Sequence, residues 1–217
     1  MEKINKILDE KRYQEDMQAQ QERWQEYLND IKNNTIKYLA KAGIPARYQQ
    51  AKLEGIKLPP RIINDTKHFL DGKYDGLFIT GTVGSGKTYL SSAVAREIIL
   101  RGQEIFFQSV PVLFQKIRAG FGKYNGSEEM LFKKMASVDL LILDDMGAEK
   151  VSDFTIDRLY LIVDDRYANM KKVIITSNLS LNEVKDKIHD RLASRISEMC
   201  KIIIMPDKDL RVELRRT

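Results

Sequence analysis

Residues 81–88 read Gly-Thr-Val-Gly-Ser-Gly-Lys-Thr and match the phosphate-binding pattern G-x-x-x-x-G-K-[ST]. Glycine allows a tight bend in which successive backbone N–H groups converge on phosphate oxygens, and the N-terminus of the following helix adds positive partial charge. In this pattern Lys87 reaches the β- and γ-phosphates, and the Thr88 hydroxyl ligates Mg²⁺. The motif predicts a site for ATP and Mg²⁺ in which the nucleotide contacts Gly81, Thr82, Val83, Gly84, Ser85, Gly86, Lys87 and Thr88.

Acidic and amide side chains follow two later apolar runs. Asp144 and Asp145 come directly after residues 140–143, as the acids of a Walker B site do at the carboxyl end of a strand. Asp144 would hold Mg²⁺, directly or through water, and Asp145 would orient or deprotonate the attacking water. Asn178 follows another such run, and it is either a hydrogen-bond partner of the γ-phosphate or attacking water or simply a turn-forming residue.

These side chains come together only if their strands share one sheet. Strand-like runs alternate with helical patterns, and the runs occupy residues 77–80, 104–108, 138–143, 173–176 and 201–205. A helical pattern starts at Lys87 and ends before Gly102, and another helix is expected over about 62–70. This alternation predicts an α/β fold with a five-stranded parallel sheet covered by helices on both faces.

The composition excludes several other classes of protein. The 217 residues are 43% hydrophobic and 31% charged, which suits one globular domain with an appendage. No apolar run approaches the roughly 20 residues of a membrane span, and no signal-peptide core is present. The single cysteine, Cys200, excludes an internal disulfide and a cysteine-based zinc site, and its apolar neighbours favour a core position. We expect a cytoplasmic protein without a membrane partner, while the net charge of +5 permits nucleic-acid binding.

Residues 3–42 contain neither Gly nor Pro and are rich in helix formers, so they predict a long helix that ends at Gly43 and Pro45. A thin apolar stripe runs along it through Met17, Trp24, Leu28, Ile31, Thr35, Tyr38 and Ala42. The stripe could form a self-association seam, pack on the protein's own domain or bind a partner through Trp24 and Tyr27. We therefore divide the chain into a helical N-terminal extension (1–43), a linker with the first helix of the ATPase module (44–75), and the ATPase domain (76–217).

Together these motifs resemble the AAA+ ATPase domain of the DnaC/DnaI helicase loaders, relatives of the DnaA initiator. The resemblance covers roughly residues 43–212 and rests on residues 42–48, 81–88, 144–150, 165–167, 176–179, 190–195 and 209–211. The pair Asp144-Asp145, where most AAA+ proteins have Asp-Glu, is itself typical of these loaders.

The resemblance gives roles to three arginines that are otherwise ordinary surface charges. Arg191 and Arg195 lie four residues apart on one face of a predicted helix, and Arg211 follows the last strand. The resemblance implies that Arg191 is an arginine finger completing the ATP site of a neighbouring subunit, and that Arg195 supports it or shares its role. It also implies that Arg211 is a sensor 2 arginine. ATP hydrolysis would then be weak for the isolated chain and stimulated by assembly and DNA.

The resemblance also implies partners. The chain would be an ATP-dependent loader of a hexameric DnaB-type replicative helicase onto single-stranded DNA during replication initiation. Position alone makes residues 1–43 the helicase-binding part. The family's DNA-binding segment corresponds to about 111–134, which is rich in basic and aromatic residues: Phe114, Lys116, Arg118, Phe121, Lys123 and Tyr124. A helix that buries its Phe and exposes its Lys would carry the same composition.

Two other functions stay open. One is an IstB-like transposition accessory ATPase, which shares the AAA+ domain and DNA binding. The Asp144-Asp145 pair and residues 165–167 favour the loader over it. The other is a loader-like protein that regulates or blocks the helicase without hydrolysing ATP. Workable chemistry at every ATP-site position argues against the second alternative.

Overall fold

A parallel sheet of five strands forms the centre of the protein. The computed structural model describes residues 2–120, 127–147 and 153–208. The strands are β1 (Gly76–Thr80), β2 (Ile105–Ser109), β3 (Leu140–Met146), β4 (Lys172–Ser177) and β5 (Cys200–Ile204). Their order is β2-β3-β4-β1-β5, and every neighbouring pair is parallel. Each strand overlaps one of the predicted runs, so the predicted α/β fold is confirmed.

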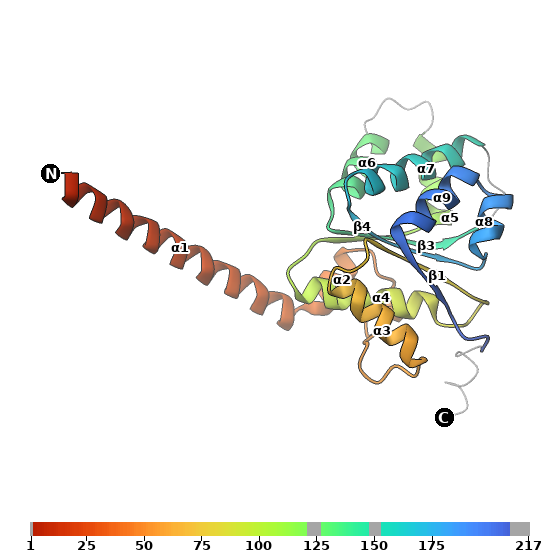
Figure 1. Ribbon diagram of the computed structural model, residues 1–217, viewed down its shortest axis with the longest axis horizontal. Coiled ribbons are helices and arrows are strands. Elements are labelled where there is room, and N and C mark those ends of the chain that lie inside the picture. Colours follow the sequence, from red (N-terminus) through yellow and green to blue (C-terminus); the bar gives the residue numbers. More distant parts are fainter. Residues whose placement is uncertain (1, 121–126, 148–152, 209–217) are drawn as a thin grey trace.

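Helices cover both faces of the sheet (Figure 1). One face carries α2 (Thr35–Lys41), α3 (Pro60–Leu70) and α4 (Lys87–Leu100), and a short 3-10 turn over Ala46–Tyr48 precedes α3. The other face carries α5 (Val110–Gly120), α6 (Ser127–Ser137), α7 (Asp153–Ala168), α8 (Leu181–Lys187) and α9 (Asp190–Met199).

Alternating strand side chains supply the two apolar cores. In β1, Leu77 and Ile79 point to the cluster under α3 and α4, whereas Phe78 points to the cluster under α5, α7 and α9. Cys200 is buried in the second cluster, as predicted, and burial raises the pKa of its thiol. Among the described residues, no helix is long and apolar enough to cross a membrane.

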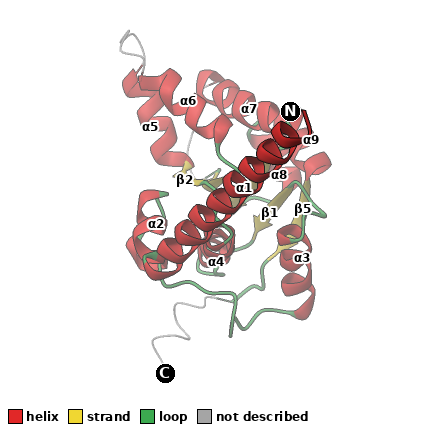
Figure 2. Ribbon diagram, turned by 90° about the vertical axis from the view of Figure 1, so that its left-hand side faces the viewer, coloured by secondary structure: helices red, strands yellow, loops and turns green. Residues whose placement is uncertain are grey.

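The N-terminal segment forms two helices rather than one. Helix α1 (Glu2–Asn33) projects away from the sheet, and α2 begins after Asn34 (Figures 1 and 2). The prediction of an unbroken helix is wrong at Asn34, where the side chains of Asn34 and Thr35 bond back to the preceding turn and Thr35 competes for a helix carbonyl. Asn34 Nδ2 donates to Asp30 Oδ1 at 2.7 Å, and Thr35 Oγ1 donates to the Ile31 carbonyl at 2.9 Å.

The later part of this segment packs on the domain. Ile31, Leu39 and Ala42 are buried in the core beneath α4, and the Phe107 N–H donates to the Ala42 carbonyl at 2.8 Å. The following Gly43 has a φ of +93°, and a Cβ there would lie 2.7 Å from the Phe107 carbonyl oxygen, so glycine is required. The stripe therefore serves for packing on the protein's own domain over this stretch.

A buried arginine ties the amino-terminal ends of β3 and β4 to helices α6 and α7. Arg166 is fully buried and donates to the carbonyls of Met135, Val138, Asp139 and Lys172 at 2.6–3.1 Å. Burial lowers the pKa of its guanidinium to about 10, so it stays charged at neutral pH. The guanidinium of Arg spreads five N–H donors over a planar fork and so reaches carbonyls that lie apart, whereas a lysine carries its three donors on one atom.

We expect Arg166→Met to lower the free energy of unfolding by at least about 3 kcal/mol, because it leaves buried carbonyls without a donor. Arg166→Lys should recover only part of this loss. Urea or thermal unfolding measures the effect, with Lys185→Met on the exposed side of α8 as a control for loss of a surface charge. An Arg166→Met variant as stable as that control would contradict the structural role.

Candidate nucleotide-binding site

The phosphate-binding loop connects β1 to α4 at the carboxyl edge of the sheet. Gly84 and Gly86 have φ angles of +86° and +93°, which lie in the left-handed region that glycine adopts without strain. Gly86 is the N-cap of α4 and has no side chain that could accept a hydrogen bond. The first N–H groups of this helix are therefore left without a side-chain acceptor. The local backbone thus has the form that an anion-binding loop requires.

Lys87 joins the loop to the end of β4. It is buried, and its Nζ donates to the carbonyls of Gly81 and Thr82 at 2.7 and 2.9 Å and to Asn178 Oδ1 at 2.6 Å. The sequence placed Lys87 and Asn178 in one site although 91 residues separate them, and the structure brings them into direct contact. Asn178 therefore does more than form a turn.

Thr88 and Asp144 form an oxygen-rich pair beside the loop. Thr88 Oγ1 lies 3.1 Å from both carboxylate oxygens of Asp144, and Thr176 Oγ1 donates to Asp144 Oδ1 at 2.7 Å. Burial raises the pKa of Asp144 above its ordinary value, while the two hydroxyl groups act in the opposite direction. A buried carboxylate next to a hydroxyl suits Mg²⁺, which prefers oxygen ligands and offsets the cost of burying negative charge.

Asp145 lies at the same edge, half-buried, with Asn178 Nδ2 3.4 Å from its Oδ1. It has a φ of +62°, which is uncommon for a residue with a side chain and often marks functional sites. The structure thus gathers Lys87, Thr88, Asp144, Asp145 and Asn178 at one edge, as the motifs predicted.

The three arginines differ in where they lie. Arg191 is exposed at the start of α9, and its side chain makes no hydrogen bond or ion pair with the described residues. Arg195, one turn later, pairs through Nε with Asp164 Oδ1 at 2.7 Å and lies 4.4 Å from the centre of the Tyr167 ring. Within the described residues neither arginine bonds to the phosphate loop. Arg211 lies outside the described residues.

The segment over 111–134 is largely helical, in α5 and α6, and residues 121–126 lie outside the described part. Phe114 is buried in the core, and Lys116 Nζ donates to Gln108 Oε1 at 2.9 Å. Phe114 therefore packs in the core, whereas the exposed Lys116 fits either interpretation. The side chains of Arg118, Phe121, Lys123 and Tyr124 lie outside the described residues, so their proposed DNA contacts stay a prediction.

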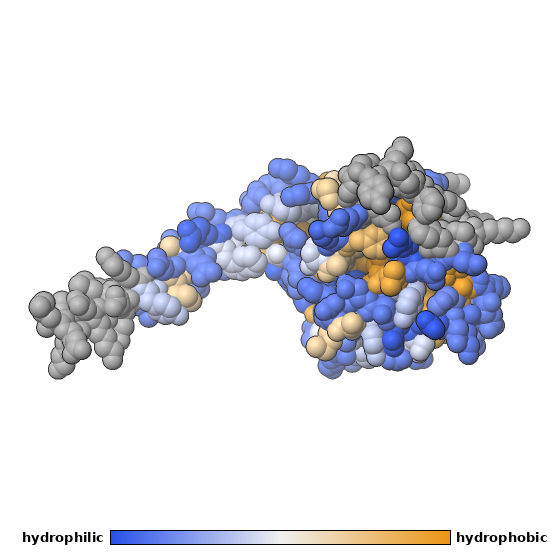
Figure 3. Space-filling view, turned by 90° about the horizontal axis from the view of Figure 1, so that it is seen from above, coloured by the Kyte–Doolittle hydropathy of each residue, from blue (hydrophilic) through white to orange (hydrophobic). Residues whose placement is uncertain are grey.

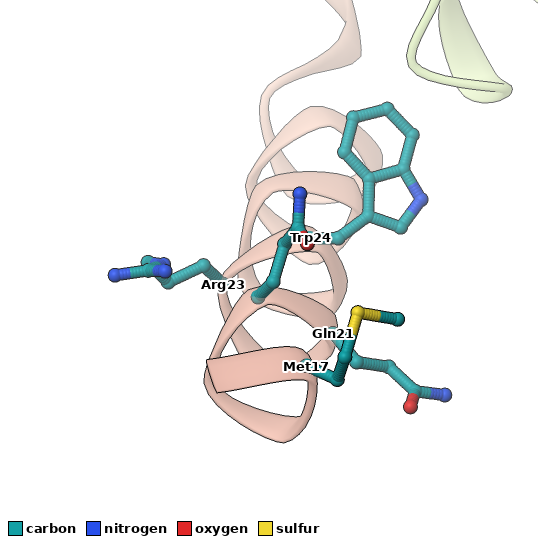
Figure 4. Close-up of a pocket in the computed structure, with 5 residues that line it drawn as sticks. Met17, Gln21, Arg23 and Trp24 are labelled. Carbon is teal, nitrogen blue, oxygen red and sulfur yellow. The ribbon is translucent and has the colours of Figure 1, made fainter. Parts of the chain in front are cut away.

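A second candidate surface lies on α1, where an open pocket of about 520 Å³ is lined by Met17, Gln20, Gln21, Arg23 and Trp24. Arg23 points to the opposite side of the helix from Trp24 (Figure 4), so this is a shallow surface rather than an enclosed cavity. The described surface of the projecting helix α1, the N-terminal arm, is otherwise mostly hydrophilic (Figure 3). Trp24 packs over Gly102, after the end of α4, so this surface lies at the end of α4 opposite the phosphate loop.

Sequence reasoning gave no role to two polar side chains of the site. Thr176 is fully buried and contacts both neighbouring acids, and Asp207 accepts a hydrogen bond from Thr82 of the loop at 2.9 Å. Thr176 could have been noticed in the sequence because it is a polar β-branched residue at the end of an otherwise apolar run. Nothing local marks Asp207, because its partner is 125 residues away.

The fold and the loop define an AAA+ protein with a P-loop. The chain belongs to the IstB-like ATP binding protein family, whose model matches residues 5–216. It is 26% identical over 126 residues to the replicative helicase loader DnaC of Escherichia coli (strain K12), which is 58% of this chain and 51% of that protein. The chain therefore spans about half the length of this curated relative.

Solved structures show the same fold. The crystal structure of the DnaC helicase loader aligns with a TM-score of 0.67 at 24% identity over 75% of this chain and 100% of that chain. AMPPCP-bound DnaA from Aquifex aeolicus aligns with a TM-score of 0.67 at 25% identity over 80% of this chain and 55% of that chain. The resemblance to DnaC-type AAA+ proteins is confirmed.

We expect Mg²⁺ to raise the ATP affinity of the unchanged chain about tenfold, and Asp144→Asn to remove this increase. In EDTA the ATP affinity of Asp144→Asn should stay near that of the unchanged chain. The reason is that the amide keeps the shape of the side chain but loses its charge. Binding of a fluorescent ATP analogue with and without Mg²⁺ measures this. Asp139→Asn, before the opposite end of the same strand, controls for the loss of an acid. A normal Mg²⁺ response in Asp144→Asn would contradict the metal assignment.

Proposed function

We propose that this protein hydrolyses ATP with Mg²⁺ and uses it to load a hexameric DnaB-type replicative helicase onto single-stranded DNA. The observation that carries the ATPase part is the convergence of Lys87, Thr88, Asp144, Asp145 and Asn178 at one edge of the sheet. The similarity to the helicase loader DnaC supports the loading part.

Each residue has a distinct task in this proposal. Lys87 leaves the loop carbonyls to contact the β- and γ-phosphates, and Asn178 stays beside the γ-phosphate. Thr88 and Asp144 would hold Mg²⁺, which would supply positive charge next to the phosphate oxygens. Asp145 orients or deprotonates the attacking water, and its left-handed backbone directs it toward the same edge.

Self-association completes the site. Arg191 is exposed and unpaired within the described chain, which suits a side chain that reaches into a neighbouring subunit. Arg195 is held by Asp164 and Tyr167, and in this proposal it supports the helix that carries Arg191. Arg211 contacts phosphate in its own subunit. Nucleotide occupancy then favours assembly, because each subunit contributes to its neighbour's site.

We expect Arg191→Ala to retain ATP affinity yet lose most of its assembly-stimulated hydrolysis, by roughly 10³-fold or more. Lys87→Ala should be inactive because it cannot hold the phosphates. Mixing the two inactive variants should restore turnover, since a Lys87→Ala subunit still donates Arg191 to its neighbour. If the mixture stays inactive, the finger is not supplied between subunits. If Lys87→Ala instead recovers turnover only when it is mixed with Arg195→Ala, Arg195 is the finger.

A second candidate function has support of its own. The family model that matches almost the whole chain is the IstB-like one, which favours a transposition accessory ATPase that would serve a transposase. The third possibility, a protein that blocks the helicase, requires a site that does not turn over ATP. Partner choice separates the first two functions, and turnover separates both from the third.

We expect the full chain to retain a DnaB-type helicase and not a transposase in a pull-down, and its ATPase rate to rise with helicase and single-stranded DNA. Removal of residues 2–20 should abolish helicase binding while leaving the fold intact, because it spares Trp24, Ile31 and Leu39, which pack on the domain. Capture of the transposase instead would favour the IstB-like function. Helicase binding without any turnover would favour the blocker, and full helicase binding by the truncated chain would place the contact elsewhere.

A further inference from the structure

Strand β3 carries one more residue than β4 where the two acids lie. Leu143 pairs with Ile175 and Met146 pairs with Ser177, so two residues of β3 face the single residue Thr176. Such a bulge interrupts the hydrogen-bonding ladder and turns the side chains of the bulged strand in new directions. The left-handed φ of Asp145 lies within this bulge. The bulge therefore determines where both acids point.

The Thr176 hydroxyl takes over the hydrogen bonds that the ladder loses there. Its Oγ1 accepts from the Asp145 N–H at 2.9 Å and donates to Asp144 Oδ1 at 2.7 Å. A hydroxyl has one proton, so donating it to Asp144 leaves its lone pairs to accept from Asp145. Thr176 is 1% exposed, so solvent has no access with which to replace this hydroxyl. One side chain thus contacts both acids from the neighbouring strand.

Two further hydroxyl groups, of Ser177 and Thr80, fix the same edge but reach neither acid. Ser177 Oγ donates to the Met146 carbonyl at 2.6 Å and accepts from the Leu179 N–H at 3.0 Å. Thr80 Oγ1 donates to the Leu179 carbonyl at 2.8 Å. These bonds hold the ends of β1, β3 and β4 in place, whereas Thr176 is the β4 side chain that bonds to both acids, at the carboxylate of Asp144 and the backbone N–H of Asp145.

We propose that Thr176 is a positioning residue that orients Asp144 toward Mg²⁺ and Asp145 toward the attacking water, without touching the nucleotide. The inference rests on the proposed ATPase function. Thr176 holds Oδ1 of Asp144 at 2.7 Å, and this fixes the carboxylate plane so that both oxygens lie 3.1 Å from the Thr88 hydroxyl, beside which Mg²⁺ would bind. Because it also holds the backbone of Asp145, loss of the hydroxyl affects metal affinity and catalysis together, and phosphate binding by Lys87 remains.

The test compares three variants of the full chain. Thr176→Val removes the hydroxyl with little change in shape, and Thr176→Ser keeps the hydroxyl. Thr66→Val is the matched control, since Thr66 is equally buried and donates only to the Ile62 carbonyl inside α3. Binding of a fluorescent ATP analogue is titrated with Mg²⁺ and repeated in EDTA, hydrolysis is followed over the same Mg²⁺ range, and thermal unfolding is recorded for each variant.

We expect Thr176→Val to raise the Mg²⁺ concentration for half-maximal effect by about tenfold or more, as loss of residues that orient metal ligands does. Its kcat should fall, its affinity in EDTA should stay unchanged, and Thr176→Ser should restore both properties. Thr66→Val should alter thermal unfolding alone. A Thr176→Val variant with the Mg²⁺ response of the unchanged chain overturns this inference and leaves the proposed function standing. If ATP binding by the unchanged chain does not depend on Mg²⁺, both this inference and the proposed function are overturned.

Discussion

The hydrogen bonds that converge on the buried Asp144 carboxylate hold together the parts of the nucleotide site. They come from α4 through Thr88 and from β4 through Thr176. A carboxylate in this position is costly to bury, and the raised pKa of Asp144 reflects that cost. The two hydroxyl groups reduce the cost, and a bound cation would reduce it further. Asp144 thus links the start of α4, which follows the phosphate-binding loop, to the end of β4.

Helix α4 connects this site to the N-terminal arm. Its first residue, Lys87, contacts the loop and Asn178, and Gly102, which follows its last turn, lies under Trp24 of α1. A helix of 14 residues spans about 20 Å, so the arm attaches well away from the nucleotide. Residues 13–23 stay exposed, whereas Ile31 and Leu39 belong to the domain core. Trp24 of α1 and the phosphate-binding loop therefore lie at opposite ends of α4.

Local sequence patterns predicted the strands and the loop because short apolar runs and a fixed glycine spacing encode them directly. The break at Asn34 was not predicted, because it coincides with side-chain hydrogen bonds to the preceding turn that only the structure shows. Thr176 was missed as a site residue because a bulge is a property of two paired strands, which no single stretch of sequence shows. Arg166 appeared in a family motif without a role, and only the fold brings it to its four carbonyl acceptors.

The arginines show the same limit in a different way. Arg191 and Arg195 share one face of α9, yet a partner 31 residues away, Asp164, holds only the second. Their spacing predicted a common face and could not predict this difference, because it depends on how α7 packs against α9. A trans role for Arg191 concerns a second copy of the chain, whose placement lies beyond the fold of one subunit.

A structure of the full chain with Mg²⁺ and a non-hydrolysable ATP analogue tests the central claim most directly. We expect Lys87 Nζ to exchange the Gly81 and Thr82 carbonyls for phosphate oxygens, and the metal to lie between Thr88 and Asp144. Thr176 should keep its bond to Oδ1 of Asp144. A nucleotide bound elsewhere, or a metal that contacts neither Thr88 nor Asp144, would contradict it.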